Sequence, residues 1–115
     1  MLLNIVERTV EPNIAVIEVS GRLALGRESQ RIETMVDDLA ARGSAKVVLD
    51  LTRVEYIDSA GIGMLALVSG KFKEAGGVMA IVAPEGGRVL QMLNLTQMSS
   101  IVKVCSTFAA AAAAV

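Results

Sequence analysis

The stretch that decides the fold runs from Lys46 to Val68 and reads KVVLDLTRVEYIDSAGIGMLALV. Its first six residues are a nearly continuous apolar run, which is typical of a strand covered on both faces. Its last seven residues are also apolar, and we expect a helix from about Ser59 to Glu74, stopped by the glycines at 76 and 77. A buried strand, a tight loop and a helix in this order favour an α/β fold.

Upstream of this stretch, the pattern predicts a hairpin and a helix. Residues 2–10 and 14–19 are strand-like, the turn residues at 11–13 join them, and Ser20-Gly21 is expected to end the second strand. Residues 26–42 then carry apolar side chains at helical spacing, and Gly43 is a stop signal. The apolar positions are Ile32, Met35, Val36 and Leu39.

Downstream, strands and helices continue to alternate. We expect a strand over 78–83, a helix beginning at Pro84-Glu85 with Val89, Leu90 and Leu93 as its buried face, and a strand over 101–104. Ser106 is a candidate cap for an alanine-rich terminal segment, which is either a packed helix or a frayed end. The whole pattern predicts one α/β domain, residues 1–115, with a mixed sheet of four to five strands and about four helices packed on it.

Composition excludes several classes of function. The 11 basic and 12 acidic residues nearly balance, so no electrostatic footprint for nucleic acid or an anionic membrane is present. The chain has no histidine, which removes the commonest general base, the Ser/His/Asp triad and most zinc sites. A single cysteine, Cys105, excludes an internal disulfide and is expected to be a small core residue. With no signal peptide or membrane-spanning run, we expect a cytoplasmic protein without cofactor or metal.

Ser59 has two compatible interpretations. At the start of a helix its hydroxyl can accept a hydrogen bond from a free backbone N–H group, so it can be an ordinary cap. The same position tolerates a phosphate, because the helix dipole partly compensates the negative charge. Asp58 is either a turn residue that bonds its own backbone or a group that orients a kinase.

Three features together resemble the STAS family, the anti-sigma factor antagonists and their relatives. The strongest is Leu49-Asp50-Leu51 with the segment 54–62, which looks like the family's signature strand, loop and phosphoacceptor serine. The others are Gly21-Arg22-Leu23, and Leu95-Thr96 with the alanine-rich end. The resemblance covers nearly the whole chain, and it implies a domain that works by reversible protein–protein contact and is not an enzyme.

By this resemblance, the unphosphorylated chain binds an anti-sigma factor that is also a serine kinase, and ATP and Mg²⁺ belong to that partner. Phosphorylation of Ser59 then breaks the contact, and a serine phosphatase restores it. Many relatives have an aspartate in the loop after Gly-x-Leu, where this chain has Ala24. A non-switching scaffold or transport-complex subunit is the alternative, and a homodimer is also open.

The helix after Ser59 is apolar on more than one side, so part of it is expected to be a docking surface. Met64, Leu67 or Val68 is the candidate for that part, with methionine suited to adaptable contacts. We also expect Gly61 and Gly63 to leave bare backbone for a partner. The predicted partner-binding residues are Asp58, Ser59, Ala60, Gly61, Ile62, Met64 and Leu67.

Two further features have simpler interpretations. Glu85-Gly86-Gly87-Arg88 lacks the spacing of a phosphate-binding loop and is expected to be a helix start. The arginines at 22, 27, 31 and 53 are most simply solvated. Arg22 and Arg27 flank Ala24, where they can meet an acidic partner.

Overall fold

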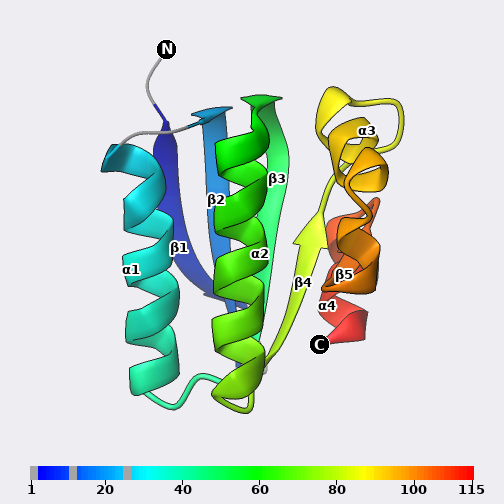
Figure 1. Ribbon diagram of the computed structural model, residues 1–115. Coiled ribbons are helices and arrows are strands. Elements are labelled where there is room, and N and C mark those ends of the chain that lie inside the picture. The colour runs from blue at the N-terminus through cyan, green and yellow to red at the C-terminus, as the bar shows by residue number, and fades with distance from the viewer. Residues whose placement is uncertain (1–2, 11–12, 25–26) are drawn as a thin grey trace.

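The computed structural model describes residues 3–10, 13–24 and 27–115, with the backbone alone at 27 and 28. Figure 1 shows a twisted sheet with two long helices side by side in front of it. In chain order the elements are β1 Asn4–Val10, β2 Ile14–Leu23, α1 Arg27–Ala41, β3 Lys46–Ile57, α2 Ser59–Glu74, β4 Val78–Val82, α3 Arg88–Leu95, the 3₁₀ helix η1 Met98–Ser100, β5 Lys103–Cys105 and α4 Phe108–Ala114.

The sheet is mixed, as the sequence predicts. Its strand order is β1-β2-β3-β4-β5, with β1 antiparallel to β2 and all other pairs parallel. The pairing of Val10 with Ile14 confirms the hairpin. The predicted starts at residues 2 and 26 and the turn residues 11 and 12 lie outside the described residues. Each parallel pair is joined through a helix, which brings the carboxyl ends of β2, β3 and β4 to one edge of the sheet.

The two faces of the sheet are covered unequally. One face carries the main core, to which α1, α2, α3 and η1 contribute. The opposite face carries a small cluster under α4, which lies behind the sheet in Figure 1. Its buried members are Ile14, Val16, Val48, Ala80, Val82 and Ala111. Because Ala111 is fully buried, the terminal alanine segment is a packed helix and not a frayed end.

The strands β2 and β3 run further than their sequence predicts. The second strand does not stop at Ser20-Gly21 but continues to Leu23, and Gly21 takes a positive φ of 100° within it. Register shifts beside Gly21 absorb this conformation, and Leu23 then pairs with Ile57 at the far end of β3. A glycine that looks like a strand end is therefore an irregularity inside a longer strand.

Glycines end α1 and α2 as predicted. Gly43 has φ +83°, its N–H donates to the carbonyl of Ala40 at 3.1 Å, and Ser44 N–H donates to Leu39 at 2.9 Å. This pair of bonds is a Schellman motif, which satisfies the last carbonyls of α1. The same motif closes α2 at Gly76 and Gly77.

Three predicted boundaries after β4 are wrong. The third helix begins at Arg88 and not at Pro84, because Gly86 at φ +79° keeps the preceding residues in a turn. The last strand is residues 103–105 and not 101–104, since η1 occupies the chain just before it. The cap of α4 is Thr107 and not Ser106: the Thr107 side chain accepts from Ala110 N–H at 3.1 Å.

Candidate functional site

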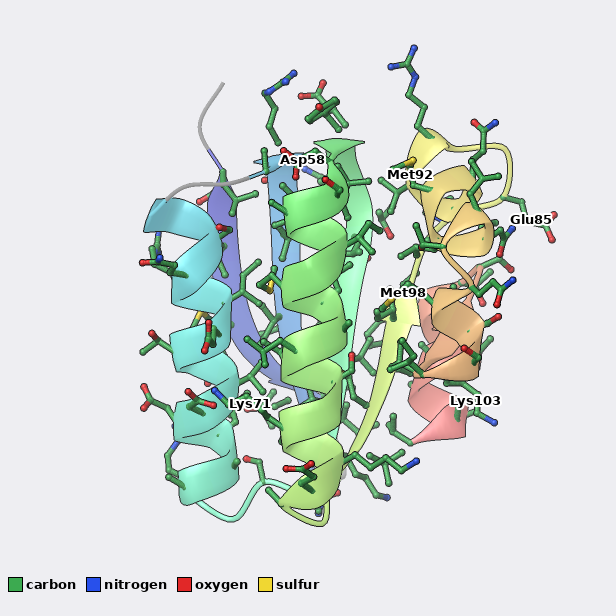
Figure 2. The ribbon with its side chains drawn as sticks, viewed as in Figure 1. Asp58, Lys71, Glu85, Met92, Met98 and Lys103 are labelled. Atoms are coloured by element: carbon green, nitrogen blue, oxygen red, sulfur yellow. The ribbon has the colours of Figure 1, made fainter. Side chains whose placement is uncertain are left out.

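The predicted serine loop lies where β3 ends and α2 begins, at the carboxyl edge of the parallel strands. Asp58 is the single residue between the two elements, and Ser59 is the first residue of the helix. Figure 2 places Asp58 at this end of the molecule, above α2. Ligands and partners of open α/β sheets commonly bind at this edge, because the loops that follow the strands gather there.

The cap of α2 is Asp58, so the interpretation of Ser59 as an ordinary helix cap is wrong. The Asp58 Oδ1 atom accepts a hydrogen bond from Gly61 N–H at 2.8 Å, with an extended backbone at residue 58. This confirms the interpretation of Asp58 as a residue that bonds its own backbone. Ser59 is exposed, and its hydroxyl has no hydrogen-bond partner in the described part of the chain. The Ser59 hydroxyl is therefore accessible to another molecule.

The serine loop packs closely against the backbone at the end of β2. Asp58 N–H donates to the Leu23 carbonyl at 3.4 Å, and Gly61 lies directly on the same carbonyl. A Cβ atom at Gly61 would come within 2.4 Å of that oxygen, so only glycine fits. Gly61 is thus a packing residue and not bare backbone for a partner, whereas Gly63 is exposed with open space around it. Ala24 follows Leu23 directly in the chain, so it lies one residue from this contact.

The exposed side of α2 carries fewer apolar residues than the sequence analysis predicts. Val68 is 1% exposed and belongs to the core, so it is not part of a docking surface. Leu67 is 48% exposed, and Met64 is half-buried at the edge of the core. Ile62, also predicted to bind a partner, is 8% exposed. Ser59, Ala60, Gly63 and Leu67 are the accessible positions, and Gly61 and Ile62 support them from inside.

A small notch lies beside this loop, between the end of β3 and α3. Its volume is about 320 Å³, and it is lined by Tyr56, Ile57, Arg88, Gln91 and Met92. The sequence analysis did not predict it, because two segments more than 30 residues apart form it together. Arg88 opens α3, and Gly86 and Gly87 in front of it form a turn without phosphate-loop spacing.

Arg22 is not merely solvated. Its guanidinium lies 4.0 Å from the centroid of the Tyr56 ring, close enough for a cation–π contact. The two residues are partners in the register of β2 and β3. The contact fixes a positive charge beside the aromatic wall of the notch, and Arg22 forms no ion pair with any described residue.

The described residues include no group of three or more His, Cys, Asp or Glu side chains placed to hold a metal. Lys71, in the last turn of α2, donates to Glu33 at 3.1 Å and to Asp37 at 3.3 Å on α1. The hydrogen bonds to Glu33 and then Asp37 raise the pKa of Lys71 above its ordinary 10.5. Cys105 is half-buried against the cluster under α4 and not fully in the core. In the described part of the chain, no helix has the length and apolar character to cross a membrane.

Comparison with known proteins gives one consistent result. The model of the STAS domain matches residues 6–111. A Thermotoga maritima protein named "Putative anti-sigma factor antagonist" is 33% identical over 75 residues, which is 65% of this chain and 66% of that protein, slightly under two thirds of its length.

Solved structures share the fold over nearly the full chain. An anti-sigma factor antagonist from Mycobacterium paratuberculosis superposes with a TM-score of 0.82 at 22% identity, covering 99% of this chain and 94% of that one. The antagonist SpoIIAA in its unphosphorylated form gives a TM-score of 0.73 at 15% identity, covering 96% and 94%. The phosphorylated form of SpoIIAA, from Bacillus, gives a TM-score of 0.67 at 13% identity, covering 93% and 96%.

Proposed function

The chain belongs to the STAS domain family, and on that premise we propose that it is an anti-sigma factor antagonist whose binding is switched off by phosphorylation of Ser59. Its partner is an anti-sigma factor with serine kinase activity, which supplies ATP and Mg²⁺. A serine phosphatase removes the phosphate and restores binding. The cytoplasm is where such partners act, and the chain itself performs no catalysis.

The observation that carries this proposal is the free hydroxyl of Ser59. It is exposed and has no described hydrogen-bond partner, while its neighbour Asp58 does the capping. A kinase therefore reaches the hydroxyl without breaking an internal bond. Proteins named in the comparisons support the chemistry, since SpoIIAA of the same fold occurs in unphosphorylated and phosphorylated forms.

Phosphorylation changes this surface in a defined way. A phosphate adds about two negative charges at the first position of α2. The helix N-terminus tolerates them, so the domain stays folded. The Asp58 carboxylate lies next to the new charge, and the exposed Leu67 belongs to the same outer side of α2. A partner that covers Ser59, Ala60 and Leu67 would have to desolvate the phosphate against an apolar contact, which opposes binding.

The rigid support under Ser59 suits a switch that acts by contact and not by refolding. Gly61 on the Leu23 carbonyl and Asp58 on Gly61 N–H hold the first turn of α2 in one place. The two forms then differ mainly in charge at one position. A partner recognises this difference only if it contacts that position.

The test is capture of partners from the lysate of the source cells with tagged wild type, Ser59→Ala and Ser59→Glu, followed by mass spectrometry. Wild type and Ser59→Ala are expected to retain an ATP-binding anti-sigma factor, and Ser59→Glu is expected to lose it. Ser99→Glu is the matched control, because Ser99 is an exposed serine in η1. The recovered partner, given ATP and Mg²⁺, should phosphorylate wild type and leave Ser59→Ala unmodified.

Two results would contradict the switch. Retention of the same partner by wild type and Ser59→Glu would favour the non-switching scaffold or transport-complex subunit. Ala24, at a position where many relatives have an aspartate, is the sequence observation that favours this alternative. Phosphorylation at another serine would move the switch away from α2. Sedimentation of the purified chain, alone and with the partner, decides between monomer and homodimer.

A further inference from the structure

The notch beside the serine loop combines an apolar wall with an unpaired cation. Tyr56, Ile57 and Met92 supply the wall, and Arg88 is the charged side chain among its lining residues. Figure 2 shows Met92 on the side of α3 that faces β3, and Glu85 on the opposite side, away from the notch. Glu85, the acidic residue of the turn before α3, therefore does not occupy the notch.

Three cations of the described surface form ion pairs with this chain's own carboxylates. Arg8 pairs with Glu18 at 3.0 Å, and Arg42 pairs with Glu7 at 3.3 Å. Lys71 has two acidic partners on α1. Arg88 and Arg22 have no ion-pair partner in the described ranges, as is also true of Lys103, but both are associated with Tyr56. Arg22 is thus stacked on the Tyr56 ring, and Arg88 lines the notch together with Tyr56.

We propose that this notch binds an acidic side chain of the protein partner, together with the apolar side chain next to it. A guanidinium presents a planar fork of donors that matches a carboxylate. Methionine and tyrosine suit an aliphatic or aromatic neighbour. This inference rests on the proposed function, because it names a second contact of the same partner.

The position of the notch joins it to the Ser59 surface. Tyr56 and Ile57 line the notch and immediately precede Asp58 and Ser59 in the chain. A partner that covers Ser59 therefore reaches Arg88 without leaving the carboxyl edge of the sheet. Arg88 thus gives this chain a positively charged contact for the partner, whereas Ala24 replaces the aspartate that many relatives have.

A protein side chain fits the notch better than a nucleotide does. The volume of about 320 Å³ is at the low end of the range for small-molecule pockets. The glycines at 86 and 87 do not have the spacing that cradles a phosphate chain. One carboxylate and one adjacent side chain satisfy the charge and fill the space.

The first test measures the affinity of the purified anti-sigma factor, recovered by capture, for wild type, Arg88→Glu and Arg88→Lys by calorimetry. Lys103→Glu is the matched control, because Lys103 is another exposed cation without an ion-pair partner among the described residues, on β5 (Figure 2). Both reversals change net charge equally. Arg88→Glu should weaken binding at least about tenfold, and Lys103→Glu less than about twofold. Arg88→Lys should fall between wild type and Arg88→Glu.

Failure of this inference is distinguishable from failure of the proposed function. If Arg88→Glu and Lys103→Glu bind equally well while Ser59→Glu does not bind, the switch stands and the notch is overturned. If Ser59→Glu binds as wild type does but Arg88→Glu is selectively weakened, the notch stands and the switch is overturned.

A second test needs no partner. Isotope-labelled protein is titrated with the blocked peptide acetyl-Glu-Leu-Glu-Phe-amide and with its counterpart in which glutamine replaces glutamate. The acidic peptide should shift the amide signals of Ile57, Gln91 and Met92 and the guanidinium signal of Arg88, and the neutral peptide should not. Equal shifts from both peptides, no shifts, or shifts from ADP alone would each overturn the proposal.

Discussion

The inner and outer sides of α2 differ in what they tolerate, although both are built from small and apolar residues. The inner side carries Gly61, Ile62, Leu65, Val68, Ser69 and Phe72, all buried against the sheet. The outer side carries Ser59, Gly63 and Leu67, all exposed. Residue types recur across the two sides, with a glycine and a leucine on each. The difference teaches that position on the helix, and not residue type, separates structural from candidate functional residues here.

The two leucines give the largest expected contrast. Leu65 is fully buried, so Leu65→Ala should reduce the free energy of unfolding by about 2–5 kcal/mol through lost burial and a cavity. Leu67 is 48% exposed, so Leu67→Ala should change it by less than about 0.5 kcal/mol. Urea denaturation of both variants measures this. Similar losses would show that Leu67 is not an outer residue.

The two glycines should respond with opposite signs. Gly61→Ala would place a Cβ atom 2.4 Å from the Leu23 carbonyl oxygen, and such overpacking typically costs about 1–3 kcal/mol. Gly63→Ala meets open space in a helix, where alanine is more stable than glycine by about 0.5–1 kcal/mol. Thermal unfolding of the pair is the measurement. A neutral Gly61→Ala would mean that the loop is not held against β2.

The neighbouring residues Asp58 and Ser59 should differ in their effect on stability, because only Asp58 caps the helix. Asp58→Ala removes the hydrogen bond to Gly61 N–H and should destabilise the chain by about 1 kcal/mol. Ser59→Ala removes a hydroxyl with no described partner and should change stability by less than about 0.5 kcal/mol. Chemical denaturation of both variants tests this. A larger loss for Ser59→Ala would return the capping role to Ser59.

The smallest expected effect lies at the lower end of α2, where Lys71 joins the helix to α1 (Figure 2). Hydrogen bonds to Glu33 and Asp37 raise the Lys71 pKa above 10.5 in the folded state. A raised pKa means that the charged form stabilises the fold below the unfolded-state pKa, and that this stability is lost as pH rises through the folded-state value. Lys71→Gln should therefore be slightly less stable than wild type at pH 7, and the difference should shrink above about pH 10.5. A difference that stays constant with pH would show that packing and not charge is responsible.

Most of the fold could be predicted from local signals. The hairpin, the apolar strands and the glycines that end α1 and α2 each follow from a few adjacent residues. Boundaries that depend on pairing or on turn conformation could not be predicted in the same way. Gly21 lies inside β2 because β3 pairs beyond it, and Pro84 precedes α3 because Gly86 has a positive φ.

The candidate site likewise contains residues that the sequence identified and features that depend on tertiary packing. Asp58 and Ser59 were singled out from the sequence, but Asp58 and not Ser59 makes the capping bond. Which residues of an all-apolar helix are exposed depends on the sheet beneath it, so the burial of Val68 and the exposure of Leu67 could not be predicted. The notch between β3 and α3 had no local signal at all.

The sequence by itself determined the α/β order of elements, the signature loop that marks the STAS family, and the absence of a histidine for catalysis. Tertiary structure alone decided that Gly61 is a packing residue, that Arg22 stacks on Tyr56, and that Arg88 stands near the serine loop. The physical reason is range. Helix and strand signals arise between neighbours in the chain, whereas burial, stacking and cavities arise between segments that only the folded structure brings together.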